Sequence, residues 1–230
     1  MREALAGSLY MGFVLSIAAY EAGMWLKKKT GFPLFNPLLV AVVLIIPILK
    51  IIHVTYEEYN EGAKYISYLL TPATVCLAIP LYKQLHLLKK HMAAVVCAIT
   101  GGVIANAVTI FSMCLAFRMS HVHYVTLLPK SITTAIGMGV SEEAGGIVTL
   151  TVVSIVITGI SGSILAETIF KAFHISHPIS RGLALGTSAH AIGTAKALEL
   201  GEIEGAMSSL SIAVAGLLTV AIVPFIANWI

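Results

Sequence analysis

The sequence has little charge and contains no aspartate. Charged residues make up 11% of its 230 residues, whereas soluble domains carry about 25%. Hydrophobic residues account for 58%, and the mean hydropathy is +0.93. A soluble fold of this composition would expose large apolar patches and aggregate. We therefore predict an all-α polytopic membrane protein, with the lipid bilayer as its solvent and a bacterial-type plasma membrane as its location.

Other scarcities exclude whole classes of function. Without aspartate, and with no Gly-x-Ser-x-Gly elbow, the chain lacks the parts of a serine hydrolase, and we expect no enzyme. The three cysteines all lie inside apolar segments, which suits small core residues better than a disulfide framework. No cluster of histidines and carboxylates has metal-ligand spacing, so we expect neither metal nor cofactor. The net charge of +3 is spread over short loops, which argues against nucleic acid as a partner.

Apolar segments follow one another along the whole chain, and we treat residues 1–230 as a single membrane domain. About 20 helical residues are needed to cross the hydrocarbon layer. Five segments are uninterrupted, at 7–26, 37–52, 92–117, 147–170 and 206–229. Three are interrupted: 62–81 at Thr71–Pro72, 122–145 at 129–131, and 179–198 at 186–188 and near Gly193. Interrupted helices are typical of the substrate sites of secondary transporters.

The distribution of basic residues predicts how the segments cross. Basic clusters lie at 27–29, 83–90 and 171–181, and positive charge in short loops marks the cytoplasmic side. This places the N terminus outside, and the count of crossings is consistent only if 122–145 is a re-entrant hairpin. We thus predict about seven transmembrane helices plus one re-entrant hairpin. The triplets at about 33–118 and 147–230 then form inverted repeats with discontinuous helices, and Pro72 should approach Ser188.

The first interruption centres on Pro72. Proline lacks a backbone N–H and restricts the residue before it, so a new half-helix can begin here. The positive end of that half-helix, with the hydroxyls of Thr71 and Thr74, would suit a carboxylate. The alternative is a proline kink whose free carbonyls are bonded by neighbouring hydroxyls.

The second interruption contains a lysine inside an apolar segment. Lys130 is a candidate anion receptor, because an unpaired lysine in a membrane costs about 2.5–3.5 kcal/mol or more. The hydroxyls of Ser131, Thr133 and Thr134 would add hydrogen-bond donors beside it. The alternative is a shallow loop from which Lys130 extends to the interface.

The third interruption combines small and polar residues. Gly186 permits a close backbone approach, and Thr187 and Ser188 could bond substrate oxygens. His190 could gate proton coupling, or it could donate a structural hydrogen bond to a facing helix. Nearby, the stretch at 159–163 is interpreted as small-residue packing between helices, and Asn106 as bonding a neighbouring helix.

Five stretches of the sequence together resemble the LrgB/CidB family of membrane proteins over almost the whole chain. They are NPLLV at 36–40, LLTPATVCLAIPLYKQ at 69–84, LPKSITTAI at 128–136, RGLALGTSAHAIGTAKA at 181–197 and EGAMSSL at 204–210. The third stretch departs from a common form of the motif, which has proline where Ala135 stands.

The resemblance implies two different functions. One is an antiholin-like regulator of murein hydrolase activity and autolysis, acting with a smaller holin-like LrgA/CidA membrane partner. The other is a carrier of hydroxy- or keto-monocarboxylates such as glycolate, glycerate or pyruvate, since related proteins, including a plastid member, resemble such carriers. A lysine and half-helix ends near the membrane midplane favour the carrier. We therefore expect a homodimer that moves a small organic anion by alternating access, with proton coupling left open.

Overall fold

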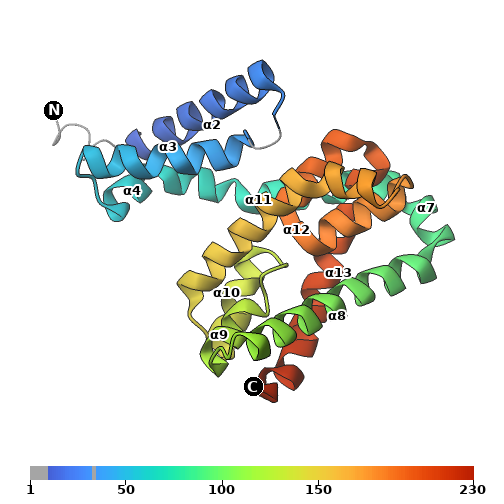
Figure 1. Cartoon of the computed structure of the whole chain (residues 1–230). Helices are drawn as coiled ribbons and strands as arrows, with labels where there is room; N and C mark the ends of the chain where they lie inside the picture. The colour runs from blue at the N-terminus through green and yellow to red at the C-terminus, as the bar shows by residue number, and fades with distance from the viewer. Residues whose placement is uncertain (1–9, 33–34) are drawn as a thin grey trace. The chain divides into compact units, whose positions relative to one another are not determined.

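The computed structural model describes residues 10–32 and 35–230, and everything assigned there is helix, turn or irregular chain (Figure 1). Within this range, the side chains of Leu70, Thr71, Thr74, Leu81 and Leu88 are not described. The chain forms two compact units, Met1–Cys76 and Leu77–Ile230. The all-α class predicted from composition is thus confirmed for the described residues, and each unit is considered separately below.

The first unit consists of short and medium helices. They are α2 (Met11–Thr30), α3 (Pro37–Ile51), α4 (Tyr56–Tyr68) and α5 (Leu70–Cys76). Asn36 caps α3 by accepting a 2.9 Å hydrogen bond from the backbone N–H of Leu38, as expected for asparagine before a helix that starts with proline. Helix α2 packs on α3 and α4, and Gly12 lies directly against the backbone of Tyr59.

The chain around Pro72 is interrupted differently from the prediction. Helix α4 ends at Tyr68, and the helical turns break at Leu69 and at Leu77 rather than at Thr71–Pro72. Pro72 is the third residue of α5, in the first helical turn, where a missing N–H leaves no helix bond unmade. The chain therefore breaks before the proline.

The second unit is built on long helices. It contains α6 (Ala78–Lys83), α7 (Leu85–Lys90), α8 (Met92–Ala116), α9 (His121–Leu127), α10 (Thr134–Glu143), α11 (Val148–Ala172), α12 (Pro178–Leu200), α13 (Glu202–Ile226) and the 3-10 turn η1 (Ala227–Trp229). Among the described helices, three are long and apolar enough to cross a membrane: α8, α11 and α13 extended by η1. Helix α3 of the first unit is apolar but shorter. The predicted number of seven crossings is therefore not confirmed.

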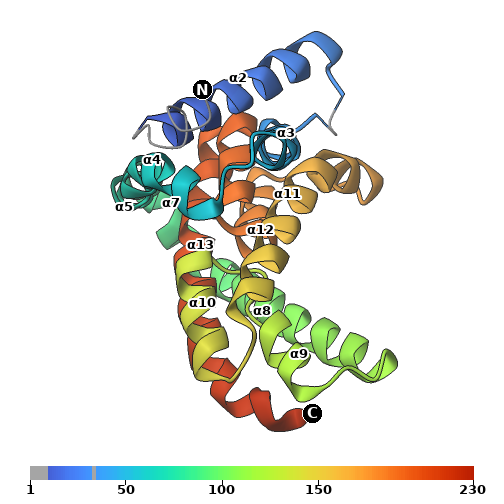
Figure 2. The same ribbon diagram turned by 90° about the vertical axis from the view of Figure 1, so that its left-hand side faces the viewer.

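Helices α9 and α10 form a hairpin whose turn lies at 128–133. Helix α9 starts where α8 ends and runs back along it, so that Leu128 reaches Asn106 in the middle of α8. Helix α10 then runs outward again along α11, because Gly137 lies against Ile155 and Ser141 bonds Thr151. The C-terminal end of α13 packs beside α9, as Figures 1 and 2 show. The hairpin predicted for 122–145 is therefore present, while its re-entry into the membrane from the outer side stays a prediction.

Helix α12 folds back on itself at His190. The backbone there has φ +42° and ψ −134°, and Gly193 lies against the carbonyl oxygen of Leu185. Residues eight apart in a straight helix are separated by about 12 Å along the axis. The arms 178–189 and 191–200 must therefore lie side by side. This segment begins and ends at the same side of the unit, so it does not cross as predicted.

Of the two interruptions predicted in α12, the one at 186–188 is wrong, and the one predicted near Gly193 falls at His190. Residues 186–188 are helical, and the hydroxyls of Thr187 and Ser188 each donate a 2.7 Å bond to a carbonyl four residues earlier. The glycines of this arm pack against α13 instead of breaking the helix. Gly186 lies against the backbone of Ser208 in α13, and Gly182 lies against that of Glu204. Glycine here permits close helix packing, and the break itself falls at His190.

Candidate functional site

A cavity of about 1020 Å³ lies in the second unit, between α8, α11 and the first arm of α12. The turn of the α9–α10 hairpin contributes two residues to it. Its polar lining consists of His91, Asn106, Thr109, Lys130, Ser131, Thr158, Ser161, His177, Ser180, Thr187 and Ser188. The lining contains no acidic residue, and its other members are apolar or glycine.

Lys130 lies at one end of this cavity and is half-buried. Its Nζ donates to the hydroxyl of Ser131 at 3.3 Å. Lys64 and Lys196 form ion pairs with glutamates, whereas no ion pair joins Lys130 to a carboxylate of the described residues. A positive charge without a countercharge in an otherwise uncharged cavity is suited to an anion.

Asn106 on α8 holds the turn that carries Lys130. Its side-chain oxygen accepts a 3.0 Å bond from Ser131, and its amide donates a 3.0 Å bond to the carbonyl of Leu128. The turn is also buried, with Leu128 and Ile132 at 1% and 3% exposure. The prediction that Asn106 bonds a neighbouring element is confirmed, but Asn106 also lines the cavity, which the sequence did not indicate.

The first arm of α12 brings Thr187 and Ser188 to the cavity, and their predicted role in binding a substrate stays a prediction. The Thr187 methyl group packs on Gly102 of α8, and both hydroxyls donate to carbonyls of their own helix. A carboxylate only accepts hydrogen bonds. These two hydroxyls would therefore have to rotate before they could bond one.

Two cavity residues on α11 were missed by the sequence interpretation. Thr158 and Ser161 line the cavity, and neither hydroxyl is hydrogen-bonded to another described residue. They are free to donate to a ligand. Ser161 lies in the stretch 159–163, for which packing between helices was predicted. That prediction is confirmed, because Gly159 contacts the His190 ring and Gly162 contacts Ala189. In the sequence, a small hydroxyl residue beside a packing glycine does not show whether it faces a cavity or a neighbouring helix.

Other predicted site residues do not line the cavity. Thr133 and Thr134 begin α10, which turns away from it. Gly186 is directed at α13, where it shapes the packing. His190 is 3% exposed and its Nε2 lies 2.9 Å from the carbonyl oxygen of Ile155. Of the two roles left open for this histidine, the geometry fits the structural one.

The remaining predicted residues belong to the first unit. Pro72 lies in α5, and the side chains of Thr71 and Thr74 lie outside the described residues. Their part in a substrate site, and the approach of Pro72 to Ser188, stay predictions.

The two turns of the second unit both reach the middle of the long helices. Asn106 and Gly102, which contact them, lie near the midpoint of the 25-residue α8, and Gly159 and Gly162 lie near that of α11. The α9–α10 turn and the α12 turn approach the middle of these helices from opposite ends of the unit. The α9–α10 hairpin starts where α8 ends, whereas the start of α12 lines the cavity together with His91 at the start of α8.

Comparison with known proteins identifies similar chains over nearly the full length. The profile of the LrgB-like family matches residues 16–229. The chain is 41% identical over 222 residues to the antiholin-like protein LrgB of Bacillus cereus strain B4264, with 96% of each chain covered. The same values hold for the antiholin-like protein LrgB of Bacillus anthracis strain A0248. No solved structure matches the chain.

Proposed function

The chain belongs to the LrgB-like family, and we propose that it is a membrane carrier for small organic anions, such as hydroxy- or keto-monocarboxylates. The observation that carries the proposal is Lys130, which faces a cavity without acidic residues from the turn of a helical hairpin. A carboxylate bound beside it would neutralise the lysine and accept hydrogen bonds from Thr158 and Ser161. The substrate would thus supply the countercharge that the protein lacks.

The arrangement of the two hairpins supports a carrier rather than an open pore. If α8, α11 and α13 cross the membrane, both turns end near its midplane, one from each side. Substrate sites of secondary transporters commonly lie at the midplane, where helices are discontinuous. A wide pore would not require a lysine held by Asn106 at such a turn.

The cavity extends unequally from the turn that carries Lys130, and we infer access from one side, as alternating access requires. The buried turn at 128–133 closes one end, while the lining continues along α8 to His91, about 22 Å from Asn106 by helical rise. The chain near that second end carries Lys89, Lys90, Lys171 and Arg181. By the positive-inside rule the cavity would open to the cytoplasm. The proposal includes a homodimer but assigns no residue to proton coupling.

Uptake into proteoliposomes tests this function. Labelled pyruvate, glycolate and lactate would be offered to vesicles that hold the purified protein, with and without an imposed pH gradient. We expect saturable uptake that Lys130→Ala abolishes and that Lys64→Ala, a change in the first unit, leaves intact. Absence of uptake by the folded wild-type protein would contradict a carrier.

A second candidate function is supported by the names of the relatives. Proteins 41% identical to this chain are called antiholin-like protein LrgB, and that name favours a regulator of autolysis acting with an LrgA-type membrane partner. Cell lysis and murein hydrolase activity, measured with and without such a partner, would test it. A regulator without transport predicts that Lys130→Ala leaves lysis unchanged, whereas loss of the whole chain alters it.

A further inference from the structure

Helix α12 packs on its two neighbours in different ways. Against α13 the contact is backbone to backbone, since Gly182 and Gly186 lie on the carbonyl oxygens of Glu204 and Ser208. The hydroxyl of Thr194, on the second arm, also lies 2.7 Å from that of Ser208, and both are buried. Such close packing leaves no space for sliding. The α12 hairpin and the start of α13 therefore behave as one rigid block.

Against α11 the same hairpin is held by side chains. Gly159 contacts the ring of His190, and Gly162 contacts the methyl group of Ala189. The His190 ring also hydrogen-bonds the Ile155 carbonyl of α11 at 2.9 Å, and opening of this interface would have to break that bond. Both interfaces depend on glycine, but the contacts with α11 are made by side chains of α12, whereas those with α13 join backbone to backbone.

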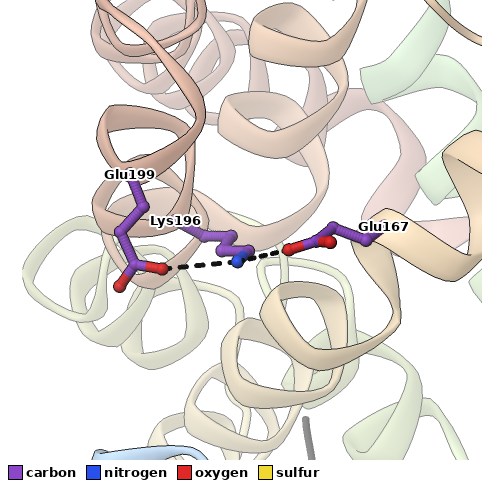
Figure 3. Close-up of polar contacts among 3 residues, drawn as sticks. All are labelled: Glu167, Lys196 and Glu199. Atoms are coloured by element: carbon purple, nitrogen blue, oxygen red, sulfur yellow. Dashed lines mark hydrogen bonds and ion pairs between the residues drawn. The ribbon is translucent and has the colours of Figure 1, made fainter. Parts of the chain in front are cut away.

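An ion pair crosses the α11–α12 interface near the open end of the hairpin. Lys196 Nζ lies 2.6 Å from Glu167 Oε1 on α11 and 3.3 Å from Glu199 Oε2 on its own arm (Figure 3). Both glutamate side chains are about half exposed, at 49% and 54%. The Lys196–Glu167 pair joins two helices, whereas the pairs Lys64–Glu61 and Lys196–Glu199 each lie within one helix. The Lys196 side chain is 16% exposed, so solvent screens the pair only in part, and ion pairs near the surface contribute little to stability.

We propose that the α11–α12 interface is the moving interface of this protein, and that the Lys196–Glu167 ion pair is the latch that holds it closed. Because α11 carries Thr158 and Ser161, its separation from α12 would move one polar wall of the cavity away from Thr187 and Ser188. The latch lies outside the cavity, so it controls the movement without touching the ligand. As a device for alternating access, it rests on the proposed carrier function.

Cysteine pairs can report the movement without any transport assay. In the full chain with its three cysteines replaced, Ala166→Cys with Ala197→Cys spans the α11–α12 interface, where both residues belong to one buried cluster. Thr194→Cys with Ser208→Cys lies within the rigid block. Lys196→Met should slow disulfide formation in the first pair about two- to fivefold, the range for a weak ion pair. It should leave the second pair unchanged, and the reversed pair Glu167→Lys with Lys196→Glu should restore the first rate.

The control change is Lys64→Met, which removes an ion pair within α4 and should alter neither rate. Equal rates for Lys196→Met and its parent in the first pair would overturn the proposal. So would an equal slowing of both pairs, because that would mean general loosening of the fold. A failure of anion uptake would contradict the carrier function instead, and it would leave the disulfide rates as they are.

Discussion

The hydroxyl of Ser131 donates a 3.0 Å hydrogen bond to the side-chain oxygen of Asn106, and this bond joins the turn of the α9–α10 hairpin to the middle of α8. The amide of the same asparagine holds the Leu128 carbonyl at the other side of the turn. One side chain therefore fixes the position from which Lys130 faces the cavity.

Replacing Asn106 should weaken anion binding. Asn106→Leu removes both bonds and leaves the Leu128 carbonyl without its side-chain partner, a loss of about 1–3 kcal/mol for a buried group. We expect a markedly higher KM for uptake and a lower melting temperature in detergent. Thr109→Val is the matched control, since Thr109 also lines the cavity but bonds only its own helix. An unchanged KM in Asn106→Leu would show that the turn is held by other contacts.

The contact between Gly102 and Thr187 should be required for the packing of α8 on α12. A β-carbon at Gly102 would lie 2.5 Å from the Thr187 methyl group, whereas one at Gly101 would meet nothing within 4 Å. We expect Gly102→Ala to lower the melting temperature and Gly101→Ala to leave it unchanged. Adding Thr187→Ser to Gly102→Ala removes the methyl group and should restore stability. If the double variant is no more stable than Gly102→Ala, the contact is not the cause.

The fold-back of α12 predicts on which side of the membrane two glutamates lie. Glu142 ends the α9–α10 hairpin, and Glu202 begins α13. Because α11 crosses between them while α12 turns back, they should lie on opposite sides, Glu142 outside and Glu202 inside. Impermeant thiol reagents applied to intact cells should label Glu142→Cys and spare Glu202→Cys, in a background without the three native cysteines. Labelling of both from outside would mean that α12 crosses the membrane.

The α9–α10 hairpin was predictable because the positions of the basic loops were consistent only if 122–145 does not cross, and its proline and paired glycines suit a turn. A break near Gly193 was also predicted and falls at His190, but the reversal of α12 was not predicted, because nothing in the sequence indicates a positive φ at a histidine. The glycines beside it suggested a break at 186–188, but they serve the packing against α13. Thr158 and Ser161 were missed because a hydroxyl in an apolar helix gives no sign of whether it faces a cavity or a neighbouring helix.

A direct binding measurement is the simplest test of whether Lys130 is an anion receptor. Titration of glycolate and pyruvate into the purified protein, followed by calorimetry, should give saturable binding to the wild type. Lys130→Met should lose that binding while keeping the wild-type melting temperature, and Thr133→Val, outside the cavity, should retain it. Equal binding by Lys130→Met and the wild type would contradict an anion site at this lysine.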